Sequence, residues 1–278
     1  CKTINLPIDC KKYMKYTEAI QSEIFTIISQ ASKELNIDSY VIGGFVRDFF
    51  LKRGTAKDID IVAVGSGIEL AKKVAQLIPN KPKVQIFKTY GTAMLRFKDV
   101  EIEFVGARKE SYSEDSRNPE VTEGTLKDDQ NRRDFTINAL ALSLNEQNFG
   151  ELLDPFNGIE DLENKIIKTP LNPDITYSDD PLRMMRAIRF ATQLIFKIEE
   201  NSLAAISKNS NRLHIITKER IVVELNKIMS SAKPSIGFLL LEQTKLLPQI
   251  LPELIALKGV EEVEGQKHKD NFYHTLEV

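Results

Sequence analysis

Two aspartates one residue apart, Asp58 and Asp60, lie inside the apolar run "DIDIVAVG". Successive side chains of a strand point to opposite faces, so both carboxylates share one face and the isoleucines take the other. Neighbouring carboxylates repel each other and are costly to bury unless a cation pairs with them. Their oxygens suit a hard divalent ion, and Mg²⁺ fits when phosphate and water complete its shell. The plain alternative is that Asp58 ends a turn and Asp60 faces solvent.

A glycine pair, Gly43 and Gly44, separates the apolar run "SYVI" from a predicted helix that continues to about Lys52. Without side chains, backbone N–H groups can approach an anion, and a helix N-terminus favours negative charge. Arg47, one turn into the helix, can reach the same anion. A tight turn is the simpler interpretation of the glycines alone. Together with the aspartates, they describe a site for a nucleoside triphosphate and its metal ions.

Glu103 in "EIEFVGAR" is a candidate third carboxylate. It joins the site only if its strand lies beside the strand of Asp58 and Asp60. Otherwise it is an ordinary exposed glutamate, and the sequence leaves both interpretations open.

A second constellation stands in "DDPLRMMRAIRF". Arg183, Arg186 and Arg189 follow each other at i, i+3 and i+6, which places them along one side of a helix beside an apolar stripe. That stripe consists of Leu182, Met185 and Ile188. Pro181 suits the first helical turn and Asp180 the cap before it, so Asp180 has a purely structural interpretation as well.

The composition indicates a globular protein with 42% hydrophobic and 28% charged residues. Lys and Arg number 38 and Asp and Glu 40, so nucleic-acid binding would depend on local clusters such as Arg132 and Arg133. No apolar run approaches the roughly 18 residues that span a bilayer, and no signal peptide is recognisable. We therefore expect no membrane association and a cytoplasmic location. Two cysteines, Cys1 and Cys10, give neither a disulfide framework nor a thiol metal site.

The predicted elements favour an α+β fold with a mixed β-sheet. Helical periodicity covers residues 17–35, and strands are expected at 39–42, 58–65, 83–90, 92–98 and 100–108, with a helix over 67–78. We expect a mobile loop over the acidic stretch 107–131 and a hairpin in "ALSLNEQNFGELLDPF". From about residue 160 the pattern is helical, with caps or breaks at the prolines. These are Pro173, Pro181, Pro234, Pro248 and Pro252.

Four ordered motifs over roughly residues 40–195 resemble a known family. The pair "GGFVRD" and "DIDIV" is similar to the head signature of the DNA polymerase beta-like nucleotidyltransferases. The motifs "RRDFTINALAL", "LDPFNGIEDL" and "DDPLRMMRAIRF" resemble the class II tRNA nucleotidyltransferase and bacterial poly(A) polymerase family.

The resemblance implies roles for individual residues. Gly43, Gly44 and Arg47 would hold the triphosphate, and Asp58 and Asp60 would bind the metal ions. The family's ribose and triphosphate motif falls on Arg132, Arg133 and Asp134. A simple helix cap before "FTINAL" is the alternative for Asp134.

The same resemblance makes Asp180 and Arg183 the candidates for reading the incoming base. A carboxylate can accept from the exocyclic amine of C or A, and a guanidinium can donate to ring acceptors, which excludes G and U. Arg186 and Arg189 are counted as nucleotide-binding candidates on the same helix. The family usually has Glu-Asp where this chain has Asp179 and Asp180.

The expected organisation is a lead-in over residues 1–16, a nucleotidyltransferase head over 17–170, a helical neck over 171–232 and the start of a helical body over 233–278. The segment "QKHKDNFYHTLEV" resembles the opening of an HD-type domain, with His268 and His274 as ligand candidates. The sequence ends before any His-Asp pair, so we expect a truncated body and ordinary histidines.

The implied activity is addition of C and A to the 3′ end of tRNA from CTP and ATP, with Mg²⁺ as cofactor. A poly(A) polymerase or an enzyme adding only part of the CCA end shares all these motifs. An inactive RNA-binding protein and an HD phosphohydrolase are the rivals from other classes. The sequence does not indicate an oligomeric state.

Overall fold

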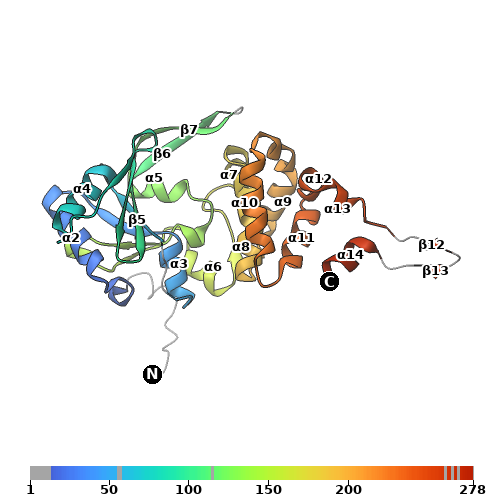
Figure 1. Ribbon diagram of the computed structural model, residues 1–278, viewed down its shortest axis with the longest axis horizontal. Helices are drawn as coiled ribbons and strands as arrows, with labels where there is room; N and C mark the ends of the chain where they lie inside the picture. Colours follow the sequence, from blue (N-terminus) through green and yellow to red (C-terminus); the bar gives the residue numbers. More distant parts are fainter. Residues whose placement is uncertain are drawn as a thin grey trace, which may run out of the picture. The chain divides into compact units, whose positions relative to one another are not determined.

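The computed structural model describes residues 14–54, 58–113, 116–259, 262–263, 266–267 and 270–277 (Figure 1). The chain divides into two compact units. One contains the residues up to Ser111 together with Glu120–Asn164, and the other contains Tyr112–Pro119 together with the chain from Lys165 onward.

The first unit is built on a seven-stranded sheet in the order β3-β4-β5-β2-β1-β8-β9. The strands are β1 Ser39–Ile42, β2 Asp58–Ala63, β3 Gln85–Phe87, β4 Thr92–Phe97, β5 Val100–Gly106, β8 Ala141–Ser143 and β9 Leu152–Leu153. β2 and β5 run parallel, whereas the other neighbours are antiparallel. The mixed sheet confirms the predicted α+β head.

Alternation along the strands decides what each face of the sheet does. On β2, Ile59 and Ile61 are buried, whereas Asp58 on the other face is exposed. Helix α4 (Gly67–Leu77) packs on β4 and β5 and against α2 (Glu23–Leu35). A smaller core lies around Leu126 at the start of α5 (Leu126–Asn131). Its other buried members are Tyr40, Ile42, Val62, Ala107 and Ala141. Because Asp60 and Val62 share one face of β2, Asp60 lies on the face of the sheet that α5 covers.

The prediction of a mobile loop over the acidic stretch 107–131 is wrong, because this stretch contains two strands and a helix. It forms a hairpin of β6 (Arg108–Ser113) and β7 (Ser116–Glu123), followed by α5. Residues 114 and 115 lie outside the described part. Main-chain pairing needs no apolar side chains, and the acidic groups here have partners: Glu110 pairs with Arg108, and Asp128 closes a capping box with Thr125.

Two predicted elements are shorter than expected. The helix over 17–35 is broken into the 3-10 turn η1 (Thr17–Ile20) and α2, because Ser22 between them has an extended backbone. The strand over 83–90 is reduced to β3, which ends in the 3-10 turn η2 (Lys88–Tyr90) before Gly91. The hairpin of β8 and β9 is confirmed, with η4 (Glu146–Asn148) in its connection.

The second unit is largely helical, as predicted. Its helices are α7 Pro173–Asp179, α8 Leu182–Leu194, α9 Glu200–Asn209, α10 Lys218–Met229, α11 Pro234–Gln243, α12 Leu247–Ile250, α13 Pro252–Ile255 and α14 Asn271–Glu277. Pro173 and Pro234 occupy first-turn positions, where a missing N–H costs nothing. Besides residues of β6 and β7, the described part of this unit has two pairs of short strands, β10 Ile166–Ile167 with β11 Lys197–Ile198 and β12 Glu262–Val263 with β13 Gln266–Lys267.

No helix among the described residues is long and apolar enough to cross a membrane. Cys1, Cys10 and His268 lie outside those residues. His274 lies on α14 with a side chain that is 55% exposed, 3.9 Å from a carboxylate oxygen of Glu277.

Candidate active site

Two carboxylates meet on the polar face of the sheet. Asp60 on β2 and Glu103 on β5 are partners in the parallel register, so Glu103 does lie on the strand beside Asp60, and its role as a third carboxylate stays a prediction. Both line a cavity of about 530 Å³, together with same-face neighbours such as Thr92 and Met94 on β4. Asp58 lies two residues before Asp60 on the same strand, is exposed and is not a lining residue.

The electrostatics of this pair fit a cation. Partial burial and the charge of Asp60 raise the pKa of the Glu103 carboxyl, against the opposing effects of a hydrogen bond with Thr92 and the charge of Arg108. Within the described part of the chain, no group of three or more His, Cys, Asp or Glu side chains is already arranged to hold a metal ion. A carboxylate pair that repels itself does suit a hard cation whose other ligands are phosphate and water.

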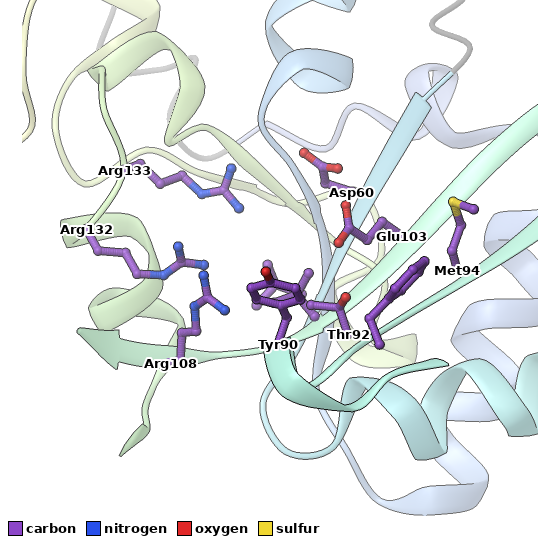
Figure 2. A pocket seen from close by; sticks show the side chains of 11 residues that line it. Asp60, Tyr90, Thr92, Met94, Glu103, Arg108, Arg132 and Arg133 are labelled. Carbon is purple, nitrogen blue, oxygen red and sulfur yellow. The ribbon is translucent and has the colours of Figure 1, made fainter. Parts of the chain in front are cut away.

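Three guanidinium groups line the opposite side of the cavity (Figure 2). Arg108 comes from the base of β6, and Arg132 and Arg133 follow α5. Fully buried Asp129 pairs with Arg132 and lies 3.2 Å from Arg133 Nη2. Glu110 accepts from Arg108 at 2.9 Å and from Arg132 at 3.2 Å. Three cations against two anions leave a net positive wall, which suits a polyphosphate.

Helix α5 holds this wall in place through its own caps and contacts. Thr125 and Asp128 form a capping box at its start. Near its end, Gln130 Nε2 donates to the carbonyl oxygens of Ala139 at 2.7 Å and Leu153 at 3.2 Å. Leu126 packs into the small core and so fixes the position of α5. The helix in turn fixes the positions of Arg132 and Arg133, which directly follow its last residue.

Gly43 lies close to one charged side chain from each wall of the cavity. It has a φ of 83°, and a Cβ on it would stand 3.1 Å from Arg133 Nη1 and 3.3 Å from Asp60 Oδ2. Gly44 begins α3 (Gly44–Phe50). A side chain at this position would meet both charged groups and would force them to shift by a few tenths of an ångström, and the positive φ also favours glycine.

Arg47 was expected to reach the triphosphate, but its side chain is held elsewhere in this structure. It is buried on α3, where its guanidinium donates to Asp48 at 2.9 and 3.0 Å and to Asn138 Oδ1 at 2.8 Å, and it does not line the cavity. Asp134 is also buried, and its Oδ1 accepts from the N–H of Phe135 and from Asn138. No side-chain cap holds η3 (Thr136–Asn138), so the structure does not make Asp134 a regular helix cap.

The remaining predicted residues lie on the second unit. Asp180 precedes α8, and its Oδ1 accepts from the N–H of Leu182 at 3.2 Å, as a cap would. Arg186 lies 5.6 Å from the ring centroid of Phe190. Arg189 is buried, 4.0 Å from the same ring and 2.6 Å from Glu224 Oε2 on α10. Arg189 is thus engaged within the helical packing, and the nucleotide roles of these residues stay predictions.

Sequence reasoning missed several residues of the site. Arg108 and Glu110 stood in the stretch assigned to a loop, and Asn138 carried no signal of its own. Asp129 could have been found, because it precedes Arg132 and Arg133 by three and four residues, the spacing of ion pairs on a helix.

Comparison with known proteins agrees with this geometry. Residues 39–168 match the model of the "Poly A polymerase head domain", and residues 195–258 match the "Probable RNA and SrmB- binding site of polymerase A". The chain is 41% identical over 202 residues to the CCA-adding enzyme of Enterococcus faecalis, covering 71% of this chain and 47% of that protein. It is 41% identical over 164 residues to the A-adding tRNA nucleotidyltransferase of Aquifex aeolicus, covering 59% of this chain and 19% of that protein.

Solved structures of tRNA nucleotidyltransferases also resemble this chain. A tRNA nucleotidyltransferase complexed with a primer tRNA and an incoming ATP analog superposes with a TM-score of 0.71 at 31% identity, covering 83% of this chain and 67% of that one. A CCA-adding enzyme in an apo form gives 0.78 at 31% identity, covering 87% and 58%.

Fold and site thus define a nucleotidyltransferase head followed by helices of the polymerase A type. The chain belongs to the class II tRNA nucleotidyltransferase and bacterial poly(A) polymerase family, as its motifs indicate. It spans between 19% and 61% of the length of the curated relatives that it matches.

Proposed function

We propose that this protein transfers C and A from CTP and ATP to the 3′ end of tRNA and releases pyrophosphate. The observation that carries the proposal is one cavity with Asp60 and Glu103 on one wall and three guanidinium groups on the other. Such a cavity can hold a triphosphate at one side and the reacting oxygens at the other. The tRNA acceptor also supports a cytoplasmic location.

The chain's own residues orient the reactants in this mechanism. Arg108, Arg132 and Arg133 hold the triphosphate so that its α-phosphorus faces the RNA 3′-hydroxyl. The 3′ oxygen attacks in line, the bond to the β-phosphate breaks and pyrophosphate leaves, without a covalent enzyme intermediate. Glu103, which lines the same cavity as the register partner of Asp60, takes the hydroxyl proton as the general base.

Mg²⁺ is the proposed cofactor, with Asp58 and Asp60 as its ligands and Glu103 beside them. When bound, it supplies stabilisation of charge on the attacking and leaving oxygens. Gly43 supports this placement, because its missing side chain leaves room for Arg133 and Asp60 beside the same stretch of backbone.

Asp180 and Arg183 are the proposed readers of the base. A carboxylate acceptor beside a guanidinium donor matches the hydrogen-bonding edges of C and A and leaves groups unpaired against G and U. Relatives of this chain include both CCA-adding and A-adding enzymes, so the choice between these activities needs a direct assay.

The test is incorporation of labelled CTP and ATP into tRNA that lacks its 3′ end and into tRNA that ends in CC. We expect Mg²⁺-dependent use of both nucleotides. Asp60→Asn should lower transfer by at least about a hundredfold while the fold survives, since it removes charge but keeps shape. Asp99→Asn, on the exposed turn between β4 and β5, is the matched control.

Four results would contradict the proposal. Near-normal transfer by Asp60→Asn would remove this residue from the metal site. Addition of A to tRNA ending in CC, without addition of C to tRNA that lacks its 3′ end, would make the protein an A-adding enzyme, and long A tails would make it a poly(A) polymerase. A wild-type protein that uses neither nucleotide would favour an inactive RNA-binding role.

A further inference from the structure

One end of the cavity is aromatic, and the proposed mechanism does not use it. Phe87, the last residue of β3, and Tyr90 in η2 both line the cavity, and they are 43% and 70% exposed. β3 is an edge strand of the sheet, and Phe87 is paired there with Thr92, which is paired with Val105 on β5. Val105 follows Glu103 by two residues, so the aromatic end continues the face of the sheet that carries the carboxylates. In the view of Figure 2, the Tyr90 ring lies between the guanidinium groups and Glu103.

The backbone holds these two rings at the cavity without covering them. Gly91, in the left-handed region with a φ of 64°, closes η2, and its N–H donates to the carbonyl oxygen of Lys88 at 3.2 Å. No stacking or cation–ring contact joins Phe87 or Tyr90 to another described residue. A single exposed aromatic side chain is ordinary, but two that line one charged cavity present flat apolar faces to a ligand.

The charge around these rings indicates the class of ligand. The chain from Leu70 to Lys98 contains seven Lys or Arg and neither Asp nor Glu, in a protein whose net charge is −2. Three of these cations, Lys81, Lys83 and Lys88, are exposed and form no ion pair with another described residue. Exposed aromatic rings among unpaired cations are the combination with which proteins bind single-stranded nucleic acids, because bases stack on the rings and phosphates meet the charges.

The other ligands of the reaction leave one base for the aromatic end. In the proposed function, the arginines of the cavity hold the triphosphate, Asp180 and Arg183 read the incoming base, and the attacking hydroxyl comes to Glu103. The base that is attached to this hydroxyl is the last base of the RNA, and it changes after every addition. Its binding site must therefore tolerate different bases, and stacking does so because every base has a flat face.

We propose that Tyr90, with Phe87 extending its apolar surface, stacks on the unpaired 3′-terminal base of the acceptor RNA. This inference rests on the proposed function. The stacked base holds the terminal nucleotide at the end of the cavity, so that its 3′-hydroxyl lies over the carboxylate face. The incoming nucleotide does not use these rings.

The first test uses fluorescence, because the chain contains no tryptophan. In Tyr90→Trp the only indole of the protein lies at the proposed stacking position. We expect tRNA ending in CC to quench its emission without any added nucleotide, and the same tRNA without its unpaired 3′ nucleotides to leave the emission unchanged. Ile86→Trp is the matched control. Ile86 is 39% exposed on the same strand as Phe87, but it is paired with buried Ala93 and does not line the cavity, so its emission should not change.

The second test separates RNA binding from nucleotide binding. Tyr90→Ala should raise the KM for tRNA ending in CC about tenfold and leave the KM for ATP near normal, since one stacking surface for the RNA is lost. Tyr90→Phe should keep the KM for this tRNA near normal, because the ring rather than the hydroxyl makes the contact. Ile86→Ala, on the opposite face of β3, should change neither KM. The exposure of Tyr90 makes loss of folding no concern, and thermal unfolding of each variant checks this.

The outcomes separate this inference from the proposed function. Quenching by ATP or CTP without RNA would place the incoming base on Tyr90 and overturn the inference. Equal quenching in Ile86→Trp, quenching by the tRNA without unpaired 3′ nucleotides, or an unchanged KM for tRNA in Tyr90→Ala would also overturn it, while wild-type transfer leaves the function intact. Quenching that needs the unpaired RNA end, in a protein that transfers neither nucleotide, would keep the stacking site and remove the proposed function.

Discussion

At the scale of the residue, Glu103 shows what a carboxylate pair costs the folded protein. Its pKa is raised above the ordinary value of 4.5 by partial burial and by Asp60. The contribution of Glu103 to the free energy of unfolding is therefore fully present below pH 4.5. It is lost as the pH rises through the pKa of the folded state. Glu103→Gln should raise the thermal midpoint at pH 7, by no more than about 2 °C because the side chain is exposed, and should give no gain at pH 4. A lower midpoint at pH 7 would instead show that a cationic partner such as Arg108 stabilises the carboxylate.

At the scale of the element, the junction of β1 and α3 lies close to two charged side chains. Gly43 and Gly54 both have a φ of 83°, so alanine at either position costs about 1–3 kcal/mol of backbone strain. Only at Gly43 would the new methyl meet Arg133 and Asp60, whereas nothing lies within 4 Å of a Cβ on Gly54. We expect Gly43→Ala to weaken nucleotide binding by at least about tenfold and Gly54→Ala to leave it near normal at a similar loss of stability. Equal nucleotide affinities in the two variants would count against a site at this junction.

At the scale of the whole molecule, the chain has two compact units, each with buried residues of its own. In the second unit, Arg189 and Glu224 form a buried ion pair between α8 and α10, which lie side by side (Figure 1). Glu224→Gln removes a negative charge from beside the buried Arg189 guanidinium and should cost about 3 kcal/mol. Hydrogen exchange should then quicken in α8 and α10 but not in the seven-stranded sheet. Glu242→Gln, which breaks a partly exposed pair with Lys258, should cost less than about 1 kcal/mol. Faster exchange throughout the sheet would show that the units unfold together.

Local patterns in the sequence were enough to predict most elements and the family. Alternation fixed the faces of β2, since Asp60 and Ile61 can only point opposite ways. The glycine pair marked the junction of β1 and α3, and the prolines marked the starts of α7 and α11. These signals succeed because each depends on the backbone geometry of a few consecutive residues.

The tertiary structure alone decided which of these residues meet. Glu103 joins Asp60 because β5 returns parallel to β2 after more than thirty intervening residues, a pairing that neither strand encodes by itself. Arg108 became part of the site because the acidic stretch folds into a hairpin, where Glu110 ties it to Arg132. Asn138 contacts Arg47, which lies 91 residues away in the chain. Such contacts depend on how strands and turns pack in space, and spacing along the chain carries no record of that.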